Sequence, residues 1–282
     1  MIKKGFPYLY EYRKAKLKRR VRKGIPDALR GIVWYNLSGA ESYKRSYPDL
    51  NDINTNDLNE LVIDEIERDI DRTFPRHFLF CEKNGRGQKS LRRVLQLYAA
   101  IDEKVGYCQG MGFMAGLLLT YMTEDDAFYV FAAALQRPLA PLRPLYFPEM
   151  KEAQKILYVF GEIGAKHLKR LWLYMEDQGM HQSMYVTEWI MTMYSRGFSF
   201  DLVTRVWDIF FHEGFKIIYR VALALLKSVE NEILSESFEN IMALLRSLPS
   251  KVDASNVIDL AFTIPLKWKD IEIAEAKFLG TK

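Results

Sequence analysis

Hydrophobic residues recur at helical spacing along almost the whole chain. The clearest case is the segment 216–231, where a wide stripe of aliphatic residues repeats every three or four positions, as in a helix that buries one face. No alternation typical of strands persists for more than a few residues, and no fixed-period repeat occurs. The pattern predicts an all-α fold, a two-lobed bundle of a dozen or more helices. Further helices are expected at 61–73, 149–163, 165–176, 182–194, 199–211 and 235–247.

Proline, glycine and small polar residues interrupt this pattern and place the expected helix ends. Pro75 ends one helix, and Ser90 is expected to cap another that follows the break at 84–87. Thr123 is in position to cap the next helix. The proline-rich stretch beyond that helix cannot be regular, so we expect the two lobes to be joined near 137–148.

The composition excludes several classes of protein. With 282 residues, of which 49% are hydrophobic, the chain can bury a large core. Two cysteines are too few for a disulfide scaffold or a cysteine-rich zinc cluster, and no two of the four histidines have metallohydrolase spacing. Phosphate-loop, nucleophile-elbow and dinucleotide-binding motifs do not occur. The sequence therefore does not predict a self-contained enzyme of the usual kinds.

The net charge of +4 conceals an asymmetry. Residues 1–23 contain ten Lys or Arg and one Glu, a net charge of +9, so the rest of the chain carries −5, the difference between +4 and +9. Residues 1–22 are therefore interpreted as a basic leader. Two roles stay open for it, a solvated helix and a peripheral contact with anionic membrane surfaces.

The longest uncharged stretch, 105–123, fits either a membrane span or a buried helix. It contains Gly106, Gly110, Gly112 and Gly116, which weaken membrane insertion, and no comparable segment accompanies it. A buried helix is favoured, because missing Cβ atoms let a neighbouring segment approach closely. The N-terminus shows no apolar run of a secretory signal, so a cytoplasmic protein is expected.

Two segments are not well explained by packing alone. In the first, Asp69, Arg72 and Thr73 share one face of a helix. Pro75 places Arg72 beside a bend, from which its guanidinium can project while Asp69 restrains its direction. By periodicity alone, an exposed ion pair worth about 0.5 kcal/mol is the favoured interpretation.

The second segment centres on Gln109, which opens an apolar helix. An amide carries both a donor and an acceptor, so it can hold a water molecule in a set orientation. Gly110 beside it leaves room for another chain or a ligand. Taken alone, a polar residue that initiates a helix is the preferred alternative.

Together these segments resemble the signature of the TBC domain, the GTPase-activating module for Rab-family small GTPases. The likeness covers roughly 23–265, which leaves 266–282 as a C-terminal tail. One departure is Gly112, where the family usually has Asn. The matching stretches are Lys23-Gly24-Ile25-Pro26 with Leu29-Arg30-Gly31-x-x-Trp34, Ile66-x-x-Asp69-x-x-Arg72-Thr73-x-Pro75, Leu91-Arg92-Arg93-Val94-Leu95 with Tyr98, Tyr107-x-Gln109-Gly110-Met111, and Arg205-Val206-Trp207-Asp208-x-x-Phe211-x-Glu213-Gly214.

The resemblance implies an activator that completes the active site of a GTP-bound Rab GTPase in trans, rather than an enzyme in its own right. Arg72 would stabilise the charge that develops on the transferred phosphoryl group, and Gln109 would orient the attacking water. The partner would carry GTP and Mg²⁺, so no cofactor of the chain's own is expected. The residues expected to support these two are Asp69, Thr73, Tyr107, Gly110, Arg30 and Trp34.

Alternatives from other classes are a non-catalytic helical adaptor, which binds a small GTPase or another trafficking protein, and an autonomous nucleotide hydrolase. Presence of both Arg72 and Gln109 argues against the adaptor, and the missing phosphate loop argues against the hydrolase. No nucleic-acid partner is expected. The implied location is the cytoplasm, with peripheral attachment to endomembranes through the leader.

Overall fold

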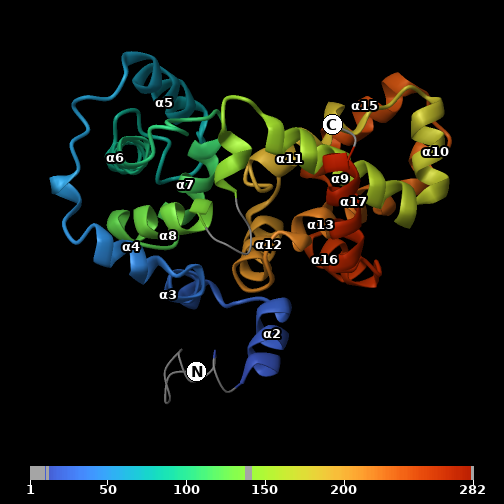
Figure 1. The fold of residues 1–282 in the computed structure, drawn as a ribbon, viewed down its shortest axis with the longest axis horizontal. Helices are drawn as coiled ribbons and strands as arrows, with labels where there is room; N and C mark the ends of the chain where they lie inside the picture. Colours follow the sequence, from blue (N-terminus) through green and yellow to red (C-terminus); the bar gives the residue numbers. More distant parts are fainter. Residues whose placement is uncertain (1–9, 11–12, 137–141, 281–282) are drawn as a thin grey trace. The chain divides into compact units, whose positions relative to one another are not determined.

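The computed structural model describes residues 10, 13–136 and 142–280. Within these residues it contains 16 α-helices and four short 3-10 helices and no strand, so the all-α prediction is confirmed. The chain divides into two compact units, Met1–Glu149 and Met150–Lys282. The division lies just beyond the joint expected near 137–148, of which 137–141 fall outside the described residues. Figure 1 colours the first unit blue to green and the second yellow to red.

The first unit is built around α7 (Met111–Leu119), a helix whose nine residues are all buried. Because apolar or small residues cover every side of it, α7 can be enclosed by other helices. Helices α5, α6 and α8 pack directly against α7. The remaining bounds in this unit are α2 (Lys14–Lys23), α3 (Asp27–Ser38), α4 (Ala40–Ser46), η1 (Leu50–Asp52), α5 (Glu60–Arg72), α6 (Arg86–Ile101), α8 (Glu124–Gln136) and η2 (Arg143–Tyr146).

The second unit centres on α13 (Lys216–Ser228), the predicted amphipathic helix, which packs against α12 and α16. The segment 266–282, which the sequence predicted to be a C-terminal tail, contains α17. This helix packs against α9, and its residues Ile271 and Ala274 are buried. This segment is therefore an integral part of the second unit. The remaining bounds are α9 (Lys151–His167), α10 (Lys169–Asp177), η3 (Gln182–Met184), α11 (Val186–Met191), α12 (Phe200–Glu213), α14 (Glu230–Ile233), α15 (Phe238–Ser247), η4 (Leu248–Ser250), α16 (Ala254–Thr263) and α17 (Trp268–Gly280).

Two expected helix boundaries are wrong. Helix α6 begins at Arg86, with Gly85 rather than Ser90 at its N-cap. No side chain caps this helix end, and Gln88 in its first turn accepts the N–H of Asn84, the residue before Gly85, at 2.8 Å. The helix expected at 182–194 is interrupted, and only its central part, α11, is α-helical.

The uncharged stretch 105–123 contains only the short helix α7, preceded by turns. Across the described residues, no helix has both the length and the apolar character that crossing a membrane requires. All nine residues of α7 are buried, so the expectation of a buried helix is confirmed.

Candidate functional site

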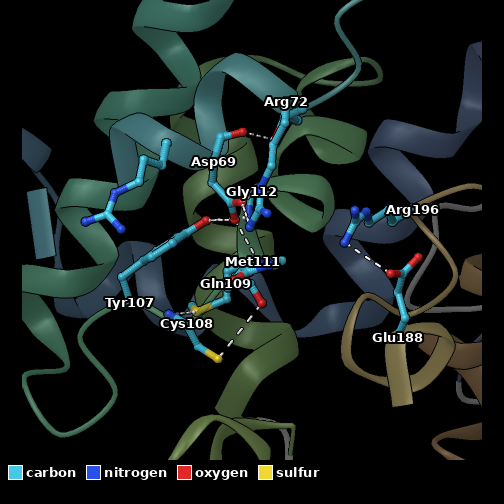
Figure 2. A network of polar contacts seen from close by, with 12 residues as sticks. Asp69, Arg72, Tyr107, Cys108, Gln109, Met111, Gly112, Glu188 and Arg196 are labelled. Atoms are coloured by element: carbon cyan, nitrogen blue, oxygen red, sulfur yellow. Dashed lines mark hydrogen bonds and ion pairs between the residues drawn. The ribbon is translucent and has the colours of Figure 1, made fainter. Parts of the chain in front are cut away.

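Helix α5 places Asp69 and Arg72 on the same side, one turn apart, at its C-terminal end. The Asp69 side chain is fully buried, whereas that of Arg72 is 37% exposed. The Arg72 Nε donates a hydrogen bond to Asp69 Oδ1, and the two side chains form an ion pair (Figure 2). The buried carboxylate therefore restrains the direction of the guanidinium, while the side chain of Arg72 stays partly exposed.

The second oxygen of Asp69 binds the segment that precedes α7. Asp69 Oδ2 accepts a hydrogen bond from the Tyr107 hydroxyl and another, of 2.7 Å, from the backbone N–H of Gly110. Thr73 also belongs to this network, because its hydroxyl donates a hydrogen bond to the backbone carbonyl of Asp69 at 2.7 Å. One buried carboxylate therefore links the end of α5 to the turn that carries Gln109 (Figure 2).

Gln109 is exposed and lies beside the guanidinium of Arg72. With its amide oxygen facing the guanidinium, Oε1 accepts hydrogen bonds from Nη1 and Nη2 of Arg72, each at 2.9 Å. Gly110 follows with φ of 102°, a left-handed conformation that glycine adopts without a steric cost. This turn lets α7 begin directly after an exposed glutamine. Arg72 and Gln109, the two candidate catalytic residues of the sequence, are therefore in contact at the protein surface.

The close approach of α5 and α7 depends on Gly112. A Cβ atom at this position would lie 2.9 Å from Thr73 Oγ1 and 3.3 Å from the Tyr107 hydroxyl. The same hydroxyl accepts the backbone N–H of Gly112 at 3.2 Å. One turn further along α7, a Cβ at Gly116 would lie 2.8 Å from Thr73 Cγ2. The glycines of α7 therefore provide the space into which Thr73 and Tyr107 pack.

Burial sets the protonation of the groups around this carboxylate. It raises the pKa of Tyr107 far above its usual value, with the neighbouring charge of Asp69 as the second cause, so the phenol stays protonated and donates. Burial, followed by the charges of Glu65 and Asp69, raises the pKa of the Cys108 thiol to about 11. Cys108 is therefore a weak nucleophile near neutral pH. No group of three or more His, Cys, Asp or Glu side chains that could hold a metal ion occurs in the described ranges.

Six of the eight sequence-predicted site residues meet at this point, while Arg30 and Trp34 do not contribute to it. The Trp34 ring packs edge-to-face on Tyr121, which lies beyond the other end of α7, at 5.1 Å between ring centroids. Arg30 pairs with Asp27 and lies over the same Tyr121 ring at 5.6 Å. These contacts indicate that both residues stabilise the packing of α3. The six that meet are Asp69, Arg72, Thr73, Tyr107, Gln109 and Gly110.

The matching stretch in the second unit also belongs to the core. Trp207 is fully buried and donates its indole N–H to the Met193 carbonyl at 3.1 Å. Asp208 is fully buried as well. Gly112 was not among the predicted site residues, although its spacing to Gly116 indicated a close approach.

The geometry can be compared with known proteins. Residues 27–234 match the model of the Rab-GTPase-TBC domain family. The chain belongs to this family. The resemblance inferred from the sequence motifs is thereby confirmed.

Relatives and solved structures agree with this membership. The chain is 35% identical to the human Ecotropic viral integration site 5 protein homolog over 271 residues, 94% of this chain and 33% of the relative. It is 32% identical to the Caenorhabditis elegans Rab GTPase-activating protein tbc-11 over 277 residues, 96% of this chain and 29% of that protein. The chain thus spans about a third of the length of the curated relatives it matches.

Among solved structures, the flagellar RabGAP TBC domain of Chlamydomonas superposes with a TM-score of 0.76 at 31% identity, covering 91% of this chain and 88% of that one. The Ypt/Rab-GAP domain of Gyp1p has a TM-score of 0.74 at 19% identity over 94% and 93% of the two chains. The second likeness supports the fold alone.

Proposed function

We propose that this chain accelerates GTP hydrolysis by a Rab-family small GTPase, with Arg72 and Gln109 acting in trans in the partner's active site. The observation that carries the proposal is the contact of these two side chains at the surface, organised by one buried carboxylate. An isolated surface ion pair needs neither a fully buried Asp69 nor an adjoining glutamine. Family membership and the relatives named Rab GTPase-activating proteins favour the same activity.

Each residue has a distinct role in the proposed mechanism. A small GTPase hydrolyses GTP slowly because charge spreading over the transferred phosphoryl group is poorly compensated. The Arg72 guanidinium, whose direction Asp69 restrains, supplies positive charge there. The Gln109 amide oxygen accepts a hydrogen bond from the attacking water, and its NH₂ group donates toward a neighbouring acceptor, which fixes the water's orientation. GTP and Mg²⁺ belong to the partner.

Asp69 acts as a positioning residue for both. Through Oδ1 it restrains the direction of Arg72, and through Oδ2 it holds the backbone of Gly110, the residue after Gln109. Displacement of a catalytic group by about 1 Å can lower the rate a hundredfold. Because Asp69 binds both segments, it keeps Arg72 and Gln109 in a fixed position relative to each other.

A panel of GTP-loaded Rab proteins tests the proposal. Substoichiometric wild-type protein should accelerate phosphate release from at least one Rab over many turnovers. Arg72→Ala should reduce that acceleration by about 10³-fold or more, the usual contribution of an arginine supplied in trans. Gln109→Ala should also suppress it strongly. Binding of a GTP-bound Rab without acceleration by the wild type, across the panel, would instead indicate a helical adaptor.

We also propose that α2 contacts anionic membrane surfaces. This helix carries seven Lys or Arg and no acidic residue, while its apolar residues Leu17 and Val21 are buried. With its apolar side chains already packed, α2 can adsorb to lipid only through charge, at about 1 kcal/mol for each cation near the surface. Replacing Lys14, Lys16 and Arg19 by Gln should therefore weaken binding to phosphatidylserine vesicles at low salt and leave hydrolysis in solution unchanged. Equal binding of the variant and the wild type would refute this contact.

A further inference from the structure

Phe78 is an exposed aromatic residue on the turn that follows Arg72. Its side chain is 83% exposed, more than that of any other large apolar residue in the described part of the chain. Single exposed apolar residues are common on protein surfaces and need no functional explanation by themselves. Phe78 differs from such residues because the backbone of the turn around it is fixed at both ends and at its apex.

The start of the turn is fixed by Phe74. This residue adopts φ of 45°, an uncommon backbone conformation outside glycine. Its ring packs edge-to-face on Phe113 of α7 at 5.6 Å between centroids and lies 6.2 Å from the ring of Phe80. The aromatic contacts of Phe74 hold the backbone directly after Arg72 and Thr73.

The end of the turn is fixed by the first turn of α6. Gln88 Nε2 donates to the backbone carbonyl of Phe80 at 3.2 Å, and its Oε1 accepts the N–H of Asn84. The neighbouring Gly87 has no Cβ, and one placed there would lie 1.9 Å from the carbonyl oxygen of Leu79. The backbone on this side of Phe78 therefore lies tightly against a helix.

The apex of the turn is held by His77. Its carbonyl accepts the N–H groups of Phe80 and Cys81, both at 2.9 Å, and its Nδ1 accepts that of Leu79 at 3.2 Å. The imidazole ring also packs beside the Phe78 ring, at 4.5 Å between centroids. Burial lowers the pKa of His77, so at neutral pH the ring is uncharged and Nδ1 can act as an acceptor.

An exposed aromatic side chain on a fixed backbone turn is well suited to binding. Little backbone conformational entropy remains to be lost when a partner covers it, and aromatic residues are enriched at protein interfaces. Phe78 is also close to the proposed catalytic pair. It lies six positions after Arg72, a separation that spans at most about 20 Å when the chain is extended, and the turns shorten that distance. A standard interface of about 800 Å² per partner is about 30 Å across, enough to include both.

We propose that Phe78 is a docking residue for the GTP-bound Rab, its ring entering an apolar depression beside the partner's nucleotide site. The inference rests on the proposed function, and it assigns Phe78 to binding rather than to the chemical step. Because the ring contacts the partner equally in the ground and transition states, its loss should raise KM and leave kcat unchanged.

Phe78→Ala tests the proposal in a hydrolysis assay with a Rab that the wild type accelerates. KM should rise at least tenfold while kcat stays within twofold, and Phe78→Leu should recover most of the loss. The matched control is Ile32→Ala, which truncates a 65% exposed residue of α3 in the same unit. Since α3 packs on Tyr121 beyond the far end of α7, this control should behave as the wild type.

An unchanged KM for Phe78→Ala, or a fall in kcat alone, would overturn the docking role. Direct binding to a Rab loaded with a non-hydrolysable GTP analogue separates this outcome from failure of the proposed function. A wild type that binds without accelerating hydrolysis would refute the activator, while weaker binding of Phe78→Ala in the same assay would still support docking. A thermal unfolding midpoint equal to that of the wild type confirms that Phe78→Ala is folded.

Discussion

The backbone N–H of Gly110 donates to Asp69 Oδ2 at 2.7 Å, although the two residues lie 41 positions apart in the chain. The same carboxylate binds Arg72 through its other oxygen. The geometry of the exposed guanidinium and that of the exposed amide therefore depend on one side chain that never reaches the surface.

Asp69→Ala is expected to damage both stability and activity. It leaves the N–H of Gly110 and the hydroxyl of Tyr107 buried without an acceptor, which should lower the free energy of unfolding by about 3 kcal/mol. Acceleration of Rab hydrolysis should fall at least tenfold in kcat even where the variant is fully folded, because Arg72 and Gln109 lose their common anchor. Chemical denaturation and single-turnover hydrolysis measure the two effects.

Glu67→Gln provides the control for that variant. Glu67 lies on the same helix and pairs with Arg92 at 2.7 Å, but its side chain is 42% exposed. Loss of such a partly exposed ion pair should lower the free energy of unfolding by less than about 1 kcal/mol. The acceleration of Rab GTP hydrolysis should be unchanged. A similar loss of activity in both variants would show that Asp69 has no special role.

Gly112→Ala is expected to disturb the contact between Thr73 and α7. The added methyl group would lie 2.9 Å from Thr73 Oγ1, so the Thr73 side chain or the backbone of α7 must shift. Overpacking of this kind costs about 1–3 kcal/mol and should lower the rate of activated hydrolysis by displacing Thr73 and its neighbour Arg72. Gly280→Ala is the matched control, since nothing lies within 4 Å of the Cβ position there. Full activity of Gly112→Ala would mean that the site tolerates this displacement.

The buried pair of Asp102 and Arg143 predicts a pH-dependent stability. Asp102 is 4% exposed and accepts two hydrogen bonds from Arg143, at 2.6 and 2.7 Å, and one from Tyr98. Burial alone raises the pKa of Asp102, but these hydrogen bonds outweigh burial and hold the pKa below its usual value. Arg143→Gln should therefore lower the free energy of unfolding by about 2 kcal/mol at neutral pH, a value reduced because Arg143 is one-third exposed.

The sign of the pH dependence follows from the lowered pKa. The carboxylate of Asp102 contributes stability above its unfolded pKa of about 3.9, and this contribution is lost as the pH falls through the lower folded value. The difference in unfolding midpoint between wild type and Arg143→Gln should therefore be largest near neutral pH and shrink in acid. The exposed ion pair Arg45–Glu41 serves as control, because Arg45→Gln should change the unfolding midpoint little at any pH. A constant difference down to about pH 3 would exclude this linkage.

The two cysteines are expected to differ in reactivity. Burial raises the pKa of Cys108 to about 11, so only about one molecule in a thousand carries the thiolate at pH 8. Cys81 is exposed. Iodoacetamide should therefore modify Cys81 at least tenfold faster than Cys108 in the folded protein, as measured by peptide mass spectrometry. Unfolding in urea should remove the difference, and equal rates in the folded state would contradict the burial of Cys108.

Helical periodicity predicted the all-α architecture and most helix positions because it reports which face of a segment is buried. It failed at the start of α6, which begins four residues before Ser90 and has no side-chain cap. Gly85 stands at the N-cap, and Gln88 in the first turn binds the backbone of Asn84 and Phe80, contacts that the residue types around Ser90 do not reveal. The sequence predicted the break at 84–87, but it did not predict that the helix starts within this break, at Arg86.

By itself, the sequence determined the fold class, the family and the identity of the two exposed residues, because each depends on local spacing and on residue types. Only the tertiary structure brought Arg72 and Gln109 into contact and excluded Arg30 and Trp34 from their site. The physical reason is that a buried carboxylate gathers donors from any part of the chain that packing brings near it. Asp69 therefore binds the end of α5 and the turn before α7 together, an outcome that depends on the space left by Gly112 as much as on any charge.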